Sequence, residues 1–303
     1  MFVNAIEEVA QFTRPIHTIT RNYGETLVSP GAATLFFVNE MGCAITCKHV
    51  VDLIGNRQAI NEKYKRFLVE KNQVGKNNKY NQRIKALEEE HNYKEDAIIQ
   101  LNEVFVGVTS EPTINYRWIN HPKYDVSILI FENFKNPLYQ SYAKFVKDSS
   151  TLKQGKFLCR LGFPFPEFTN FQYNTAKDDV EWINTGKSET PRFPIEGMLT
   201  RHIMRDNEIS GIELSTPGLR GQSGGPLFNQ EGIVCGMQSG TNHLHLGFDM
   251  KNFEYKINGR IIKVNNQPFI HVGHCVHVDI IKKFLKLSLS YTPGAACSPS
   301  TKS

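Results

Sequence analysis

The six residues Gly221-Gln222-Ser223-Gly224-Gly225-Pro226 constrain the chain more than any other stretch, because glycines on both sides of a serine favour a sharp turn. They lie between an expected strand, 211–215, and an apolar run, 232–237. Such a turn aims backbone N–H groups into one small space, which is what the oxyanion of an acyl transfer requires. Ser223 is therefore the candidate nucleophile.

The letters Gly-x-Ser-x-Gly also occur at the nucleophile elbow of α/β-hydrolases, where the serine opens a helix. Here Pro226 and the turn-like stretch 229–232 leave no room for a helix after Ser223. Upstream, His49 lies near the end of one apolar run and Asp125 at the start of another. The chain order is thus His, Asp, Ser, whereas hydrolases of the elbow type run Ser, Asp, His.

In this order the three blocks resemble the trypsin-like (chymotrypsin-fold) serine peptidases. Residues 31–38 are similar to that family's first core strand, and Leu161-Gly162-Phe163-Pro164 is similar to its Gly-Tyr-Pro segment. Each block alone is compatible with a glycine turn, a core histidine or a strand-capping aspartate, but the three together favour catalysis. The resemblance implies an all-β fold of two six-stranded Greek-key barrels, in a member of the bacterial, intracellular type without disulfides.

The resemblance also implies the roles of the site residues. Ser223 would attack, His49 would act as general base and acid, and Asp125 would fix the imidazole. The amides of Gly221 and Ser223 would form the oxyanion hole. In trypsin the residue before the nucleophile is an aspartate that pairs with a freed N-terminus; Gln222 stands there in this chain, so that zymogen switch should be absent.

By the same resemblance, residues 215–220 and 238–243 should form the walls of the S1 pocket, which holds the side chain of the substrate residue P1. Seven residues are candidates for substrate binding: Pro217, Gly218, Gln238, Ser239, Gly240, Thr241 and His243. Ser239 is also a candidate for a hydrogen bond to Asp125. The loop has no aspartate, which argues against a preference for Lys or Arg. His243 or His245 could meet an acidic side chain, and we expect a polar or small P1 residue.

An insertion over about 56–96 departs from the family. Apolar residues recur there at helical spacing in two segments, which predicts a helical hairpin within the first barrel. One interpretation is a solvated hairpin that only shields its apolar face on the barrel; the other is a docking site for a substrate or regulator. Nucleic-acid binding is disfavoured because aromatic and basic residues do not interleave.

The sequence further predicts an N-terminal barrel over 1–135, a linker over 136–152 and a C-terminal barrel with a closing helix over 153–287. Residues 165–194 are expected to form a surface loop, and residues 255–262 a hairpin with a type I′ turn at Asn258-Gly259. The tail 288–303 is expected to be disordered. An amphipathic helix is expected near the start of the chain.

Composition bounds the remaining possibilities. With 303 residues, 40% hydrophobic and 21% charged, the chain is typical of a globular protein large enough for two barrels. No apolar run approaches the about 18 residues of a membrane span, and no secretory signal is visible, so no membrane partner is expected. The net charge of +5 implies no particular partner.

Six cysteines are compatible with three disulfides, but Cys43 and Cys47 lie four apart on one expected strand, too far apart to bridge. Reduced thiols and a cytoplasmic location are therefore expected. His271, Cys275 and His277 would share a strand face, yet no fourth ligand is apparent, so neither a metal nor another cofactor is expected.

Two functions remain open. The first is a serine endopeptidase that acts through an acyl-enzyme on a few protein substrates. The alternative is a binding or regulatory module with a protease fold that is inactive until a partner docks.

Overall fold

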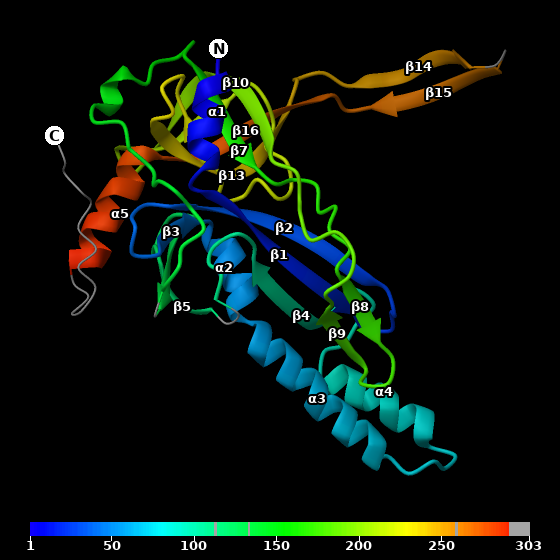
Figure 1. Ribbon diagram of the computed structural model, residues 1–303. Helices are drawn as coiled ribbons and strands as arrows, with labels where there is room; N and C mark the ends of the chain where they lie inside the picture. The colour runs from blue at the N-terminus through cyan, green and yellow to red at the C-terminus, as the bar shows by residue number, and fades with distance from the viewer. Residues whose placement is uncertain (112–113, 133, 258–259, 291–303) are drawn as a thin grey trace.

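The computed structural model describes residues 1–111, 114–132, 134–257 and 260–290. Its first half is a curled antiparallel sheet of six strands in the order β4-β1-β2-β3-β6-β5 (Figure 1). The strands are β1 (Thr13–Asn22), β2 (Val28–Phe37), β3 (Cys43–Thr46), β4 (Ile98–Phe105), β5 (Asn115–Asn120) and β6 (Ser127–Glu132). Apolar side chains of β2, β3 and β6 fill its concave core.

The second half is a closed antiparallel barrel with the strand order β10-β11-β16-β13-β12-β7. Its strands are β7 (Phe157–Gly162), β10 (Phe193–Arg205), β11 (Glu208–Leu214), β12 (Pro226–Phe228), β13 (Val234–His245) and β16 (Phe269–His277). One apolar cluster runs from the first sheet into this barrel and includes Leu35, Leu161 and Phe228. The two six-stranded units predicted from the sequence are thus confirmed, and they share a core.

Helices close the junction between the two units. The N-terminal helix α1 (Val3–Ala10) buries Ala5 and Val9, and the ring of Phe2 packs edge-on against Phe228 of the barrel, 6.1 Å between centroids. The C-terminal helix α5 (Val278–Ser290) packs its apolar face into the same cluster. Both helices lie where their apolar spacing predicts them. The expected disordered tail is wrong for 288–290, which continue α5, and its remaining residues lie outside the described ranges.

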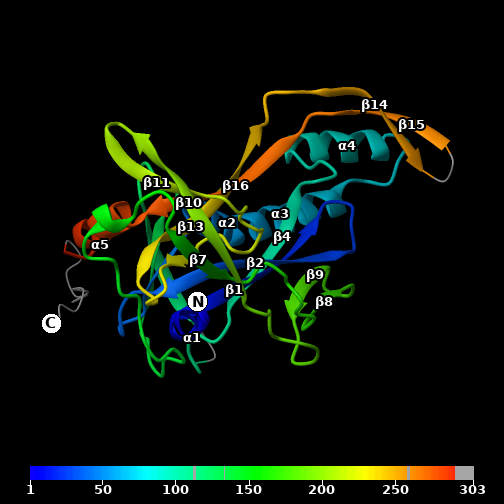
Figure 2. The same cartoon turned by 90° about the horizontal axis from the view of Figure 1, so that it is seen from above.

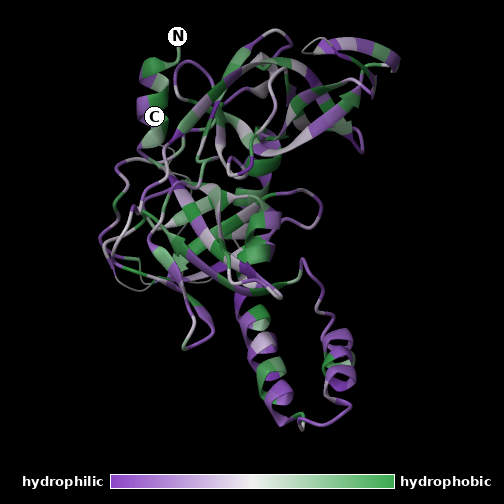
Figure 3. Cartoon of the chain, turned by 90° about the vertical axis from the view of Figure 1, so that its right-hand side faces the viewer, coloured by the Kyte–Doolittle hydropathy of each residue, from purple (hydrophilic) through white to green (hydrophobic). Residues whose placement is uncertain are grey.

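A short helix α2 (Lys48–Gly55) precedes the insertion, which contains α3 (Arg57–Gln73) and α4 (Tyr80–Glu90), and this confirms the helical hairpin. The side chain of Asn61 donates to the Leu101 carbonyl and accepts from the Leu101 amide, both at 2.9 Å. Because β4 is an edge strand, this contact covers backbone groups that would otherwise be open. Most residues of α3 and α4 are hydrophilic (Figure 3).

The segment 165–194 differs from the expected surface loop. It contains a hairpin of β8 (Phe171–Asn174) and β9 (Asp179–Trp182), which lies beside β1 and β4 in both views (Figures 1 and 2). Phe168 and Val180 form an apolar cluster with Ile19 and Val28 of the first sheet. The two strands are only four residues long, which is too short for an alternating pattern to identify them in the sequence.

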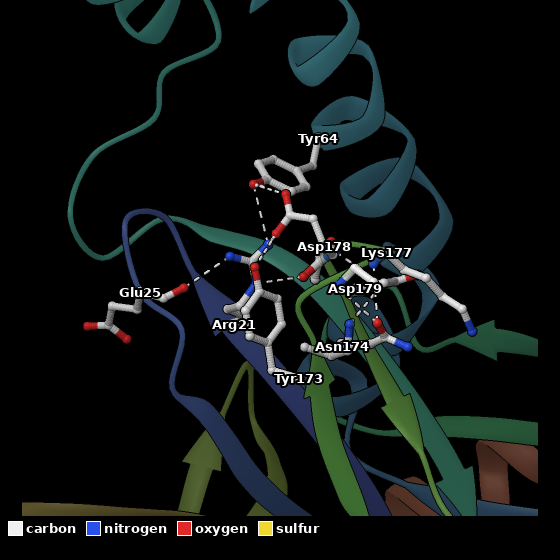
Figure 4. A network of polar contacts seen from close by, with 11 residues as sticks. Arg21, Glu25, Tyr64, Tyr173, Asn174, Lys177, Asp178 and Asp179 are labelled. Carbon is white, nitrogen blue, oxygen red and sulfur yellow. Dashed lines mark hydrogen bonds and ion pairs between the residues drawn. The ribbon is translucent and has the colours of Figure 1, made fainter. Parts of the chain in front are cut away.

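A polar network joins this hairpin to the sheet and to α3 (Figure 4). The Arg21 guanidinium on β1 lies 2.7 Å from an Asp178 carboxylate oxygen, and its side chain is only 5% exposed. The Tyr64 hydroxyl on α3 donates to the other Asp178 oxygen at 2.8 Å. Residues far apart in the chain are therefore held together by one carboxylate.

The remaining hairpin, β14 (Met250–Ile257) and β15 (Arg260–Asn266), extends from the barrel as an arm (Figure 1). Its predicted Asn258-Gly259 turn lies outside the described residues. The predicted linker 136–152 is packed rather than free, since Tyr139 and Ala143 are buried, and it includes the short 3-10 helix η1 (Ser149–Thr151). Within the described ranges, no helix has the length and apolar character needed to cross a membrane.

Candidate active site

His49 and Asp125 lie against each other at one end of the adjacent strands β3 and β6 of the first sheet. Strand β3 ends at Thr46, and His49 lies in the first turn of α2 rather than at a strand end. Asp125 lies just before β6. One Asp125 oxygen contacts His49 Nδ1 at 2.8 Å, and the other accepts the His49 backbone amide at 3.0 Å. This two-point contact fixes the ring and leaves Nε2 for proton transfer.

The protonation state of Asp125 follows from these contacts. Burial raises the pKa of Asp125, but hydrogen bonds from the His49 ring and from the His49 amide outweigh burial and hold the pKa below its ordinary value. Asp125 is thus a carboxylate at neutral pH. A carboxylate on Nδ1 stabilises the positive charge that His49 acquires when it accepts a proton.

Cys47 adds a third group beside this pair. Its thiol donates a hydrogen bond to the Gln238 carbonyl at 3.3 Å. The Cys47 sulfur, a His49 ring nitrogen and an Asp125 carboxylate oxygen, which are all atoms that can bind a metal, lie within 4.8 Å of one another. Burial and the nearby Asp125 charge raise the pKa of the Cys47 thiol well above its ordinary value. The Cys47 thiol therefore keeps its proton at neutral pH.

The loop 221–225 around the proposed nucleophile Ser223, called the nucleophile loop below, has a backbone conformation that only glycine tolerates at two positions. Gly221 and Gly224 have φ of +93° and +88°. A Cβ on Gly221 would lie 2.4 Å from the Phe163 carbonyl oxygen, and one on Gly224 would lie 2.0 Å from the Thr34 carbonyl oxygen. These glycines therefore let the loop pack directly on the backbones of β2 and of the segment after β7.

Thr34 of β2 holds the loop from the other half of the molecule. Its amide donates to the Ser223 carbonyl at 2.9 Å, and its hydroxyl donates to the Gly221 carbonyl at 2.7 Å. With these carbonyls engaged, the amides of Gly221 and Ser223 donate to no acceptor among the described residues. Both predicted oxyanion donors are thus available to a ligand.

Gln222 occupies the interior position between these two amides and is fully buried. Its side-chain nitrogen donates to the Phe193 carbonyl at 3.2 Å, and its side-chain oxygen accepts the Leu219 amide at 3.1 Å. A neutral amide with two backbone partners therefore orders the loop where trypsin uses an aspartate and a freed N-terminus.

The loop that carries Ser223 and the segment that leads to His49 share neighbours. The Gln238 carbonyl accepts both the Gly224 amide, at 2.9 Å, and the Cys47 thiol. A Cβ on Gly224 would lie 2.3 Å from the Thr46 hydroxyl oxygen. The Ser223 hydroxyl forms no hydrogen bond with a described residue, so the contact with His49 is not made in this structure. Such contacts commonly tighten only when substrate binds.

A cavity of about 430 Å³ opens beside Ser223. Six of the seven predicted substrate residues line it: Pro217, Gly218, Gln238, Gly240, Thr241 and His243. Ser239 does not, and its hydroxyl bonds to the ring and carbonyl of His274 at 2.9 and 3.1 Å instead of to Asp125. The register of β13 shifts between Gln238 and Gly240, which explains why Ser239 meets β16.

Leu219 and Arg220, from the loop 215–220 that was expected to form a wall, also line the cavity. Two residues escaped the sequence analysis: His271, which lines the cavity, and Arg160, which lies behind its wall. A charged residue inside the apolar run 157–161 was the only signal for Arg160. His271 was grouped with Cys275 and His277, but the structure spreads these along β16. His271 pairs across the strands with His243, while Cys275 and His277 are buried. His245 lies outside the cavity and bonds to Asp249.

The cysteines of the described part, Cys43, Cys47, Cys159, Cys235 and Cys275, are buried and form no disulfide with one another. Burial raises the pKa of Cys159, Cys235 and Cys275 to about 12, which keeps all three protonated.

Comparison with known proteins agrees with this geometry. A family model described as a trypsin-like peptidase domain matches residues 33–237, more than half of the chain. The match runs from β2 into β13 and includes His49, Asp125 and Ser223. No curated protein matches the chain. On its sequence and its two six-stranded units, the chain belongs to the family of trypsin-like peptidase domains.

Proposed function

We propose that the protein is a serine endopeptidase with Ser223 as nucleophile, His49 as general base and acid, and Asp125 as the group that orients His49. One observation carries this proposal: Asp125 holds His49 at two points, and the segment just before His49 packs against the glycine-framed loop that carries Ser223. The cavity next to Ser223 gives a peptide side chain a place to bind.

The reaction would proceed in two halves. The Ser223 oxygen bonds to the carbonyl carbon of the substrate while its proton moves to His49 Nε2. The C–N bond then breaks, and His49 returns that proton to the leaving amine. A water molecule, deprotonated by His49, attacks the acyl-enzyme, and the proton returns to the Ser223 oxygen. The amides of Gly221 and Ser223 would stabilise each oxyanion. A donor of this kind typically lowers the activation free energy by about 3–4 kcal/mol.

The loop contacts bear on regulation. Because Thr34 and Gln222 already order the nucleophile loop, we propose that no N-terminal processing is needed. We further propose restricted cleavage of a few protein substrates in the reducing cytoplasm, since the buried thiols suit that compartment. Rapid digestion of unrelated unfolded proteins in vitro would contradict the restriction.

The test is peptide-bond cleavage of a defined peptide library, with products identified by mass spectrometry. Wild type should generate new N-termini at discrete sites, and Ser223→Ala and His49→Ala should generate none. Ser150→Ala, which changes an exposed-loop serine bonded to Asp148, is the matched control and should cleave like wild type. Equal cleavage by wild type and Ser223→Ala would remove the assignment of the nucleophile.

A second candidate is a module that stays inactive until a partner docks. It is favoured by one observation, the missing contact between the Ser223 hydroxyl and His49. Its docking site would be the α3–α4 hairpin, where α4 buries no residue. Charge reversal at the exposed Arg83 and Lys85 should then abolish partner-dependent activity. Unchanged cleavage of the natural substrate in cells by that variant would leave the hairpin a shielding role.

A further inference from the structure

The cavity beside Ser223 is lined by donors and cationic groups. Arg220, His243 and His271 contribute to its wall, and none of the residues that line it is an aspartate or a glutamate. The remaining residues are small, apolar or neutral polar groups. A cationic substrate side chain would therefore find no counter-charge in this cavity.

Arg160 places a further positive charge directly behind the wall. It is 0% exposed, and its guanidinium donates to Gln238 Oε1 at 2.8 Å and to Thr216 Oγ1 at 2.7 Å. It also donates to the carbonyls of Thr216 and Pro217, each at 3.1 Å. All of these acceptors are neutral, and within the described ranges Arg160 forms no ion pair. Burial lowers the pKa of its guanidinium, as expected for a cation without a carboxylate.

An unpaired buried cation raises the electrostatic potential of the space next to it, because little water screens it there. Arg160 lies beside the cavity wall, since Gln238 and Pro217, which it contacts, both line the cavity. The positive charge of Arg160 therefore raises the potential inside the cavity. A ligand with one negative charge would neutralise what the protein itself leaves unpaired.

Gln238 connects the Arg160 guanidinium to the cavity wall. Because Arg160 must meet the amide oxygen of Gln238, the amide nitrogen is turned the other way. That nitrogen donates to the Gly240 carbonyl at 2.6 Å and would lie 2.1 Å from a Cβ on Gly218. Both glycines line the cavity, so the donor end of the amide lies in its wall.

The histidine pair supplies another donor at the rim. His243 and His271 are cross-strand partners with their Nδ1 atoms 2.6 Å apart, so one Nδ1–H donates to the other Nδ1. The ring that accepts at Nδ1 must carry its own proton on Nε2 when neutral. The pair therefore presents at least one N–H donor besides their mutual bond.

We propose that this cavity takes a carboxylate side chain, so that the protease cleaves after aspartate or glutamate. Arg160 is a positioning residue that acts through Gln238, and the His243–His271 pair donates to the carboxylate. The inference rests on the proposed function, since it names the P1 residue of the peptide that Ser223 attacks. It replaces the broader expectation of a polar or small P1 residue.

The test compares peptides that differ only at P1, with Glu, Asp, Gln, Asn or Lys at that position. A charge-assisted hydrogen bond corresponds to a preference of about 10- to 100-fold in kcat/KM for Glu over Gln. The same preparation is labelled with a fluorophosphonate, which reacts with Ser223 without needing a P1 side chain. Labelling without a preference for Glu or Asp would overturn this inference and leave the proposed function standing. No labelling and no cleavage would overturn both.

Two pairs of variants test which residues recognise the P1 carboxylate. Arg160→Met should reduce the Glu-to-Gln ratio to below about threefold while fluorophosphonate labelling persists. Arg21→Met, which also removes a buried arginine, controls for the structural cost and should keep the ratio. His243→Gln should lower the ratio several-fold, whereas His245→Gln, on the same strand but outside the cavity, should not.

A change in the ratio is what a purely structural role would not produce, because lost stability affects both peptides equally. If Arg160→Met does not fold, the comparison of His243→Gln with His245→Gln still decides. Ratios that stay at the wild-type value in both Arg160→Met and His243→Gln would refute the assignment.

Discussion

Replacement of Gly221 by alanine tests whether the nucleophile loop is built as described. An alanine there must adopt φ of +93°, which costs roughly 1–2 kcal/mol. Its Cβ would also lie 2.4 Å from the Phe163 carbonyl oxygen and 2.7 Å from Pro164 Cα. Both neighbours are backbone atoms that cannot rotate away, so the loop must move, adding about 1–3 kcal/mol of overpacking.

The same movement displaces one of the two oxyanion donors. Loss of such a donor typically costs a factor of about 10²–10³ in kcat. Gly221→Ala should therefore unfold at lower urea concentration than wild type and react with a fluorophosphonate about 100-fold more slowly or worse.

Gly155→Ala is the matched control. Gly155 also has a positive φ, +87°, but a Cβ there would meet nothing within 4 Å. The Gly155→Ala protein should lose only the roughly 1–2 kcal/mol of stability that an alanine with positive φ costs, and it should keep the wild-type labelling rate. If Gly221→Ala labels as fast as Gly155→Ala, then the Gly221 amide is not an oxyanion donor and the reasoning about this loop is wrong.

Three further predictions concern the triad, the pH dependence and the polar network. Asp125→Asn should keep the fold and lower kcat by about 10⁴-fold, since it removes the acceptor of the His49 ring proton; peptide hydrolysis measures this. Burial lowers the pKa of His17 and of His277 to about 4, so the unfolded state binds more protons between pH 6.5 and 4. Stability should then fall as the pH falls, by about 2 kcal/mol per histidine from pH 7 to 5, and urea unfolding of His17→Leu should lack the part of this fall, about 2 kcal/mol, that His17 contributes. Arg21→Met should cost about 3 kcal/mol in urea unfolding, because it leaves a carboxylate without its charged partner; a loss below 0.5 kcal/mol would show that the network does not stabilise the fold.

The proposed triad of His49, Asp125 and Ser223 could be named from the sequence because such chemistry requires particular residue types in a particular order. Only glycine fits the φ values at 221 and 224, so the nucleophile loop can be recognised from the glycines in the sequence. The helices of the insertion were equally visible, since Tyr64 and Phe67 follow the helical period.

Strand β1 was missed for a physical reason. It carries Thr13, His17 and Arg21, polar residues that the fold buries. Their partners are distant in the chain: the Thr190 hydroxyl bonds to His17 at 2.8 Å, and Asp178 pairs with Arg21. A polar residue buried by such long-range contacts has the same local appearance as an exposed one.

The cavity beside Ser223 shows the same limit. The acceptors of Arg160 are mainly backbone oxygens and an amide, which carry no sequence signal, and the register shift in β13 decides that Ser239 turns to His274. The residues that form the cavity walls could therefore be predicted from the positions of the loops, whereas the positive charge that Arg160 places behind these walls could not.

The central claim is that Ser223 is a nucleophile activated by His49. Reaction of the folded protein with a fluorophosphonate, followed by mass spectrometry of the peptides, tests it most directly. We predict one adduct, on Ser223, that is absent from Ser223→Ala and formed far more slowly by His49→Ala. An adduct on another residue, or none on wild-type protein that is folded and at neutral pH, would contradict the claim.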